Sequence, residues 1–217
     1  MNFKQQFIPV ALAACLLGQA PLSHATSISQ KALRPAVVKY LQQRGNLCLG
    51  KFAWPVDVSN LDTEHNTDNA VQMPVLEKIG LVSSSTERLQ TQEESSAPGA
   101  TVTHYQLTPL GQQFYLPVNS VTLAPGDKAI THPRDFCAAK LTLDKIVSLD
   151  PPQAVQNRPE TTVTYTYRVS AADWTKNPEV LQVFPMLDKI IKGERSLQLK
   201  QRFRLTNNSW SAVNLWE

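Results

Sequence analysis

Two stretches in the second half of the chain alternate between apolar and polar side chains. Residues 161–170 alternate between an apolar and a polar series. The apolar series is Val163, Tyr165, Tyr167 and Val169, and the polar series is Thr162, Thr164, Thr166 and Arg168. Residues 197–205 alternate in the same way. A period of two is typical of antiparallel strands with one buried face. Residues 140–149 follow the same pattern, but Lys145 interrupts it and indicates a bulge.

A helical pattern lies between these strands. Apolar side chains from Leu181 to Ile191 fall on one helical face, and Asn177 is placed to cap its start. Pro185 should kink this helix, because proline removes a backbone donor and clashes with the preceding turn. A hairpin over 151–160, a turn at Asn207-Asn208 and a last strand over 210–216 complete the order. We therefore expect residues 119–217 to form an antiparallel sheet with one packed helix.

The preceding half combines helices with short strands. Residues 29–44 place Leu33, Val37 and Leu41 on one helical face behind a capping Ser29, and a second helix over 70–80 ends at Gly80. Further expected elements are a strand over 47–54, a polar loop over 57–69, a Ser-rich hairpin turning at 95–99, its return strand over 101–107 and a short helix over 109–114. Residues 117–134 contain three prolines and predict a connector, with a module boundary near 118–125.

One part of this half resembles a known fold. Gly80-Leu81-Val82 ends a helix, a hairpin follows, and Tyr105-x-Leu107-Thr108-x-x-Gly111 begins the next helix. This order resembles the end of a winged-helix domain, with the hairpin as the wing, and the resemblance spans residues 29–118 when the 29–44 helix is counted. It implies a winged-helix-like module over 26–118, which together with the antiparallel sheet module expected over 119–217 makes an α+β chain. Glu77 in the helix and Glu87, Glu93 and Glu94 in the hairpin argue against DNA binding, because a DNA reader faces phosphate with cations.

The first 25 residues have the features of a secretion signal. Lys4 is followed by an apolar run over 7–17 that is too short to span a bilayer, and Ser23-His24-Ala25 has small residues at the cleavage positions. A competing interpretation is a bacterial lipobox at Leu12-Ala13-Ala14-Cys15, in which Cys15 carries a lipid. Both predict an exported protein, periplasmic or secreted in the first case and membrane-anchored in the second.

Export gives the cysteines a structural meaning. Under either interpretation of the signal, Cys48 and Cys137 remain as a pair in an oxidising compartment, which favours a disulfide over two buried free thiols. Such a bond would close a loop of about 90 residues, worth on the order of 4 kcal/mol in the chain-entropy model. It would tie the two modules together near their junction.

Charge and composition exclude some functions. The formal charge is +3, and removal of residues 1–25 leaves 20 cations against 18 acids, a charge of +2. That value gives no support for nucleic-acid binding. With 42% hydrophobic residues, the chain has enough apolar surface for a packed core.

The sequence contains no recognisable catalytic motif. It lacks Gly-x-Ser-x-Gly, His-Glu-x-x-His and a penicillin-type serine motif, and His65, His104 and His132 have no paired spacing. Oxygen side chains at 62, 64, 66 and 68 resemble a calcium loop, but Thr67 and Met73 stand where an EF-hand needs Gly and an acid. We expect no catalytic residue, no metal site and no cofactor.

A basic strand face is the candidate for binding. Lys200, Arg202 and Arg204 form the polar series of one strand, and Arg168 belongs to that of another. Neighbouring strands would make them a contact surface for an envelope protein or an anionic surface, with membrane contact expected only if Cys15 is lipidated. The alternative is a solvated strand face. We therefore expect a non-enzymatic binding or accessory protein of the cell envelope; the alternatives are an enzyme of unfamiliar type, or a DNA-binding regulator if the signal is misread.

Overall fold

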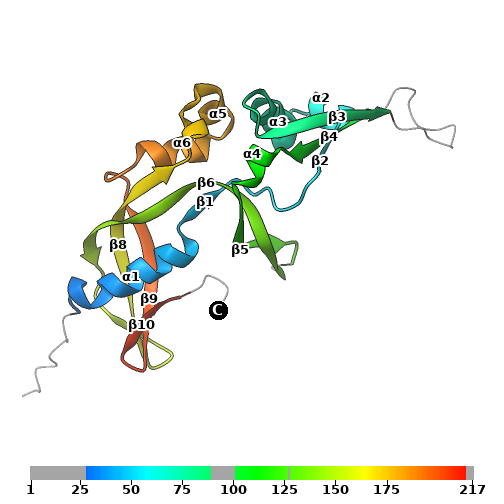
Figure 1. Ribbon diagram of the computed structural model, residues 1–217. Coiled ribbons are helices and arrows are strands. Elements are labelled where there is room, and N and C mark those ends of the chain that lie inside the picture. Colours follow the sequence, from blue (N-terminus) through cyan, green and yellow to red (C-terminus); the bar gives the residue numbers. More distant parts are fainter. Residues whose placement is uncertain (1–27, 89–100, 127, 214–217) are drawn as a thin grey trace, which may run out of the picture.

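The computed structural model describes residues 28–88, 101–126 and 128–213, which form an α+β fold built mostly from antiparallel sheet (Figure 1). Its helices are α1 (Gln30–Arg44), α2 (Asn60–Glu64), α3 (Asp68–Lys78), α4 (Pro109–Gln112), α5 (Pro178–Val183) and α6 (Pro185–Lys192), with a 3-10 turn over Asp173–Lys176. Its strands are β1 (Asn46–Cys48), β2 (Val56–Ser59), β3 (Val82–Arg88), β4 (Thr101–Leu107), β5 (Tyr115–Ala124), β6 (Lys128–Leu149), β7 (Gln153–Val155), β8 (Arg158–Ala171), β9 (Leu199–Thr206) and β10 (Ser209–Ala212).

The strands form two sheets. The larger has the order β1-β6-β8-β9-β10, with β5 also paired to β6 and β7 to β8, and the smaller has the order β2-β4-β3. Every pairing is antiparallel. β6 is 22 residues long, and its first part pairs with β5 while its last part pairs with β8.

Helix α1 packs across the larger sheet (Figure 1). Ser29 accepts a hydrogen bond from the Ala32 N–H, as the capping prediction requires. The apolar side of α1 is buried against β6, β8 and β9 in a core that includes Leu33, Val37, Leu41, Leu141, Val163, Tyr167 and Phe203. The sequence grouped the 29–44 helix with the winged-helix segment, and the structure corrects this grouping by placing the helix on the larger sheet. The helix packs there because the apolar face of β8 and β9 can bury the apolar side of α1.

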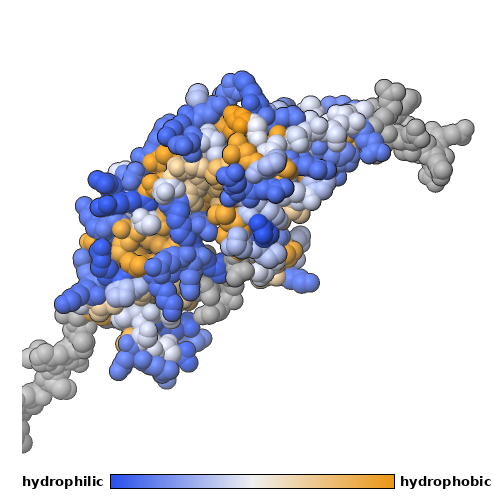
Figure 2. Space-filling view, viewed as in Figure 1, coloured by the Kyte–Doolittle hydropathy of each residue, from blue (hydrophilic) through white to orange (hydrophobic). Residues whose placement is uncertain are grey.

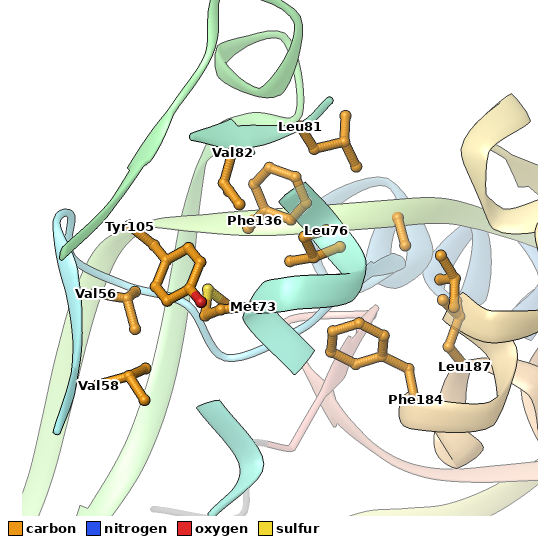
Figure 3. Packing of buried hydrophobic residues seen from close by; sticks show 12 residues of the cluster. Val56, Val58, Met73, Leu76, Leu81, Val82, Tyr105, Phe136, Phe184 and Leu187 are labelled. Atoms are coloured by element: carbon orange, nitrogen blue, oxygen red, sulfur yellow. The ribbon is translucent and has the colours of Figure 1, made fainter. Parts of the chain in front are cut away.

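A second core lies under the smaller sheet (Figure 3). Met73 and Leu76 of α3 meet side chains from the smaller sheet, from β6 and from the α5–α6 region, among them Val82, Tyr105, Phe136, Phe184 and Leu187. Where α5 lies beside α3, hydrophobic residues also show at the surface (Figure 2). Phe136 belongs to this core and Leu141 to the α1 core, so β6 passes through both.

Three more sequence expectations are wrong. The strand expected over 47–54 is confined to β1, Asn46–Cys48. Residues 117–134 form a hairpin of β5 and β6, not a connector, because the prolines occupy positions a hairpin tolerates: Pro117 borders a register irregularity and Pro125-Gly126 lies between the strands. Residues 57–69 are largely ordered as β2, α2 and the start of α3. Their polar character reflects capping, since the Ser59 hydroxyl oxygen accepts from the Asp62 N–H and the Asp62 carboxylate accepts from the Ser59 N–H.

Other expectations are confirmed. The helix over 178–192 breaks at Phe184, one residue before Pro185. The register of β6 against β8 shifts between Leu143 and Lys145, as the bulge prediction requires. Asn207 and Asn208 have φ of 50° and 58° and join β9 to β10. The hairpin of β3 and β4 is formed, but its expected turn at 95–99 lies outside the described residues.

Candidate functional site

The basic strand face, defined as Arg168, Lys200, Arg202 and Arg204, lies on β8 and β9. Its side chains alternate with the residues that face α1. In the β8–β9 register Arg204 is opposite Glu160, Arg202 is opposite Thr162 and Lys200 is opposite Thr164. Arg168 is four residues beyond Thr164 on β8, about 13 Å along the strand at 3.3 Å per residue. The structure therefore brings three of the four cations into one row and sets Arg168 apart from them.

Glu160 lies beside two of these cations and accepts a hydrogen bond from one of them, Arg204. The Glu160 side chain is only 3% exposed, with Oε1 2.6 Å from Nε of Arg204 and Oε2 3.6 Å from Nε of Arg202. The Arg204 side chain is 18% exposed, and that of Arg202 is 52% exposed. Arg204 is consequently a structural partner of a buried carboxylate, while Arg202 still reaches solvent.

Asp144 holds Arg168 in a similar way. The Arg168 Nε donates to Oδ1 of Asp144 at 3.2 Å, and the Thr166 hydroxyl donates to Oδ2 at 3.0 Å. The hydrogen bond from Thr166, with further help from Arg168, lowers the pKa of Asp144 below its ordinary value. Arg168 stays 57% exposed and Lys200 is exposed. The face therefore presents Arg168, Lys200 and Arg202 to solvent above two acids.

Sequence reasoning missed both acids. Glu160 has the same strand parity as Thr162 and Arg168, so extending the alternation of β8 by one step would have placed it on this face. Asp144 is displaced by the bulge, and a period of two carries no signal for its position.

The histidines lie in separate places. On the smaller sheet, His104 Nδ1 is 2.7 Å from Oδ1 of Asp57, and its Nε2 is 3.6 Å from Oε2 of Glu87. On β6, His132 stacks on Phe52 at 3.8 Å between ring centroids and its Nε2 is 2.8 Å from the Thr122 hydroxyl. Within residues 28–88, 101–126 and 128–213, no three His, Cys, Asp or Glu side chains are placed to hold a metal ion.

The disulfide between Cys48 and Cys137 is formed, and these residues are partners in the β1–β6 register. A buried polar cluster adjoins it. Asp135, 3% exposed, accepts hydrogen bonds from the N–H groups of Lys51 and Phe136 at 2.8 and 2.7 Å. The Lys51 ammonium donates to Oδ1 of Asn69 at 2.5 Å. Burial raises the pKa of Asp135 and lowers that of Lys51.

These contacts identify the surroundings of Cys48 and Cys137 as a structural junction that ties the β1–β2 connection to β6. The disulfide also indicates a compartment outside the cytoplasm. The proposed lipidation residue Cys15 and the signal segment lie outside the described residues.

None of the described helices is long and apolar enough to cross a membrane. Comparisons with protein-family models, with curated proteins and with solved structures find no match to this chain.

Proposed function

We propose that this chain is an exported protein of the cell envelope, periplasmic or secreted after cleavage before Thr26, or membrane-anchored through Cys15, and that it acts by binding rather than by catalysis. The features of the first 25 residues and the Cys48–Cys137 disulfide support export. The ion pairs at Glu160 and Asp144 position cations on a sheet surface, which suits recognition of charge.

The observation that carries the binding role is the basic strand face. Asp144 holds Arg168 by a hydrogen bond, so this guanidinium is oriented before a partner arrives, while Arg202 Nε lies 3.6 Å from Oε2 of Glu160. More than half of each arginine side chain remains exposed. Orientation in advance reduces the entropy lost on binding. Lys200 adds a third exposed cation. The chemistry that fits these exposed cations is an anionic surface, on an envelope protein or on a membrane.

The binding free energy that three cations can supply is small. Each cation near an anionic membrane contributes about 1 kcal/mol, so three contribute about 3 kcal/mol. That is less than the roughly 4.1 kcal/mol of a millimolar complex. The face therefore acts together with a second contact, either a lipid at Cys15 or an adjoining protein surface.

The test compares two variants with the same change in charge. Lys200→Glu with Arg168→Gln alters the face and leaves Arg204 with Glu160. Lys189→Glu with Arg34→Gln alters exposed residues on α6 and α1 instead. Sedimentation with phosphatidylglycerol vesicles, against phosphatidylcholine vesicles and across salt concentrations, measures membrane binding. Recovery of crosslinked partners from the native envelope measures protein binding. Loss specific to the first variant supports the proposal, and equal behaviour in both assays contradicts it.

The winged-helix resemblance is a proposal about part of the fold. The order α2, α3, β3, β4 and α4 contains the helix, the hairpin and the helix start that the resemblance requires. Gly80 has a φ of 77° after α3, and its carbonyl accepts from the Thr108 hydroxyl at 2.7 Å. These observations support a winged-helix-like segment without α1.

The mass of the protein from its native host separates the alternatives. A chain beginning at Thr26, with two thiols appearing only on reduction, fits a periplasmic or secreted binding protein. A lipidated Cys15 at the N-terminus places the protein on a membrane. An uncleaved chain with free thiols would contradict export and favour a DNA-binding winged-helix regulator. An enzyme of unfamiliar type would have to use a pair such as His104 and Asp57.

A further inference from the structure

We propose that a cavity at the junction of the smaller sheet and the β5–β6 hairpin binds a carboxylate attached to an apolar or aromatic group. The cavity has a volume of about 460 Å³ and is lined by Trp54, Pro55, Gln106, Leu107, Gln112, Tyr115 and Arg134. That volume lies in the range of roughly 300 to 1,000 Å³ that is usual for small-molecule sites. The proposal is independent of the basic strand face, which lies on other strands.

The wall of this cavity comes from five segments. Trp54 and Pro55 precede β2, Gln106 and Leu107 end β4, Gln112 ends α4, Tyr115 begins β5, and Arg134 lies on β6. Helix α4 is fixed at its start, because the Thr108 hydroxyl accepts from the Gly111 N–H at 3.1 Å and donates to the Gly80 carbonyl at 2.7 Å. The Trp54 ring packs edge-on against Phe136, with centroids 5.9 Å apart. The polar groups therefore stand on a packed frame.

Arg134 supplies the charge. Its guanidinium lies over the Tyr115 ring with Cζ 4.7 Å from the centroid, and one of its N–H groups donates to the Tyr115 carbonyl. Tyr115 is itself fixed, since its hydroxyl donates to the Phe52 carbonyl at 2.6 Å. A guanidinium has five N–H donors, so this contact leaves further donors for a ligand. The Arg134 side chain is exposed and accessible.

The hydrogen-bond donors of Arg134 and of the nearby amide side chains favour a carboxylate as the ligand. Among the residues that the structure describes, the lining has one cation and no acid. Gln106 and Gln112 are exposed, and neither amide side chain hydrogen bonds to another residue in the part of the chain that the structure describes. A planar guanidinium matches a carboxylate in two parallel hydrogen bonds, and the amides add further donors.

The remaining wall fits an apolar group. Trp54, Pro55 and Leu107 supply apolar surface beside the donors. A single cation suits the charge of a carboxylate better than that of a phosphate dianion. A sugar fits less well, because the described lining residues include no carboxylate to accept from its hydroxyls and Arg134 already covers a face of Tyr115. Either a free organic acid or the C-terminal carboxylate of a peptide would provide this chemistry.

Calorimetric titration of the disulfide-bonded protein tests the site with three probes. N-acetylphenylalanine represents a peptide C-terminus, 3-phenylpropionate represents a free acid, and N-acetylphenylalaninamide is the neutral control. At least one acid should bind, and binding by N-acetylphenylalanine should exceed that of its amide at least about tenfold if the ligand is a peptide terminus. Binding of 3-phenylpropionate alone would identify a free organic acid as the ligand.

Variants locate the binding. Arg134→Gln should weaken acid binding by about tenfold to a hundredfold, because a charge-assisted hydrogen bond is lost. Arg158→Gln, an exposed arginine on the β7–β8 hairpin, should change nothing. Gln112→Glu keeps the Arg134–Tyr115 contact and places an acid in the lining, so it should also reject the acids. Equal binding of acid and amide, acid binding unchanged by both Arg134→Gln and Gln112→Glu, or no saturable binding of either acid at millimolar concentration would each overturn the proposal.

Discussion

Glu160 on β8 and Arg204 on β9 face one another across the sheet, with Oε1 2.6 Å from Nε and the Glu160 side chain 3% exposed. Oε2 of Glu160 accepts no hydrogen bond from any residue that the structure describes, although the Arg202 Nε lies 3.6 Å away. Compensation of this buried carboxylate therefore depends most on Arg204. Two arginines from the same alternating series consequently have different roles, one structural and one available to a partner.

Replacing Arg204 should destabilise the protein strongly. Arg204→Met leaves the Glu160 carboxylate buried without its close partner, and we expect a loss of about 3 to 5 kcal/mol in the free energy of unfolding, measured in urea. The double variant Glu160→Met with Arg204→Met should recover most of that loss, because two apolar side chains can replace a buried ion pair. The exposed Lys200 provides the control, since Lys200→Met should change stability by no more than about 0.5 kcal/mol. Equal effects of Arg204→Met and Lys200→Met would show that the pair has no structural role.

Reducing the disulfide should also destabilise the fold. Cys48 and Cys137 are separated by 89 positions, so their bond restricts a long loop in the unfolded chain. The chain-entropy model gives about 4 to 5 kcal/mol for such a loop. Urea unfolding with and without reductant measures the difference. The double variant Cys48→Ala with Cys137→Ala should match the reduced protein and show no further response to reductant. A response that persists in this variant would mean that the reductant acts elsewhere.

The periodic elements were predictable from sequence because their pattern is local. The alternation that includes Tyr165 and Tyr167 predicted β8 and its buried side. Pro185 predicted the break between α5 and α6. The destination of α1 was not predictable, since an apolar helical stripe does not specify which sheet it covers. The β5–β6 hairpin was not predicted, because Pro117 and Pro125 indicated a connector. Proline is also tolerated at strand edges and in turns, so its presence does not exclude a hairpin.

The basic strand face was also only partly predictable from sequence. The alternation of β9 predicted that Lys200, Arg202 and Arg204 share one face. Their different roles depend on the register against β8, which sets Glu160 opposite Arg204. β8 and β9 are joined through α5 and α6 and not by a hairpin turn, so no turn residue in the sequence indicates that register. The cavity beside Arg134 combines five segments and has no local signature at all.

Gly111 permits the close approach of α4 to Leu81, in the turn between α3 and β3. A Cβ added at this position would lie 2.0 Å from the Leu81 carbonyl oxygen, which also accepts a hydrogen bond from the Thr108 N–H at 3.1 Å. Gly111→Ala should therefore cost about 3 kcal/mol or more, at the upper end of overpacking effects, because a backbone atom must move. Thermal and urea unfolding measure the loss. Gln113→Ala, on an exposed neighbour, should stay within about 0.5 kcal/mol, and a similar value for Gly111→Ala would contradict the close packing.

Asp135 should make stability fall as pH rises across the acid range. Burial raises its pKa, although hydrogen bonds from the Lys51 and Phe136 N–H groups act in the opposite direction. A raised pKa means that the folded state holds a proton at pH values where the unfolded chain has lost it. The stabilising contribution is therefore fully present below the unfolded pKa of about 3.9 and disappears as pH rises through the folded value.

Comparison with Asp135→Asn isolates this effect, because the amide oxygen can still accept from the two N–H groups but the side chain does not titrate. Between about pH 3.5 and 7, the free energy of unfolding of the unsubstituted protein should fall relative to the variant, by about 1.4 kcal/mol for each unit by which the folded pKa exceeds the unfolded one. Asp173 gives a control of opposite sign. The hydrogen bond from Lys176 lowers its pKa, so the unsubstituted protein should gain stability relative to Asp173→Asn as pH rises. Parallel curves for the unsubstituted protein and Asp135→Asn would show that the buried carboxyl has the same proton affinity in both states, and that its hydrogen bonds offset its burial completely.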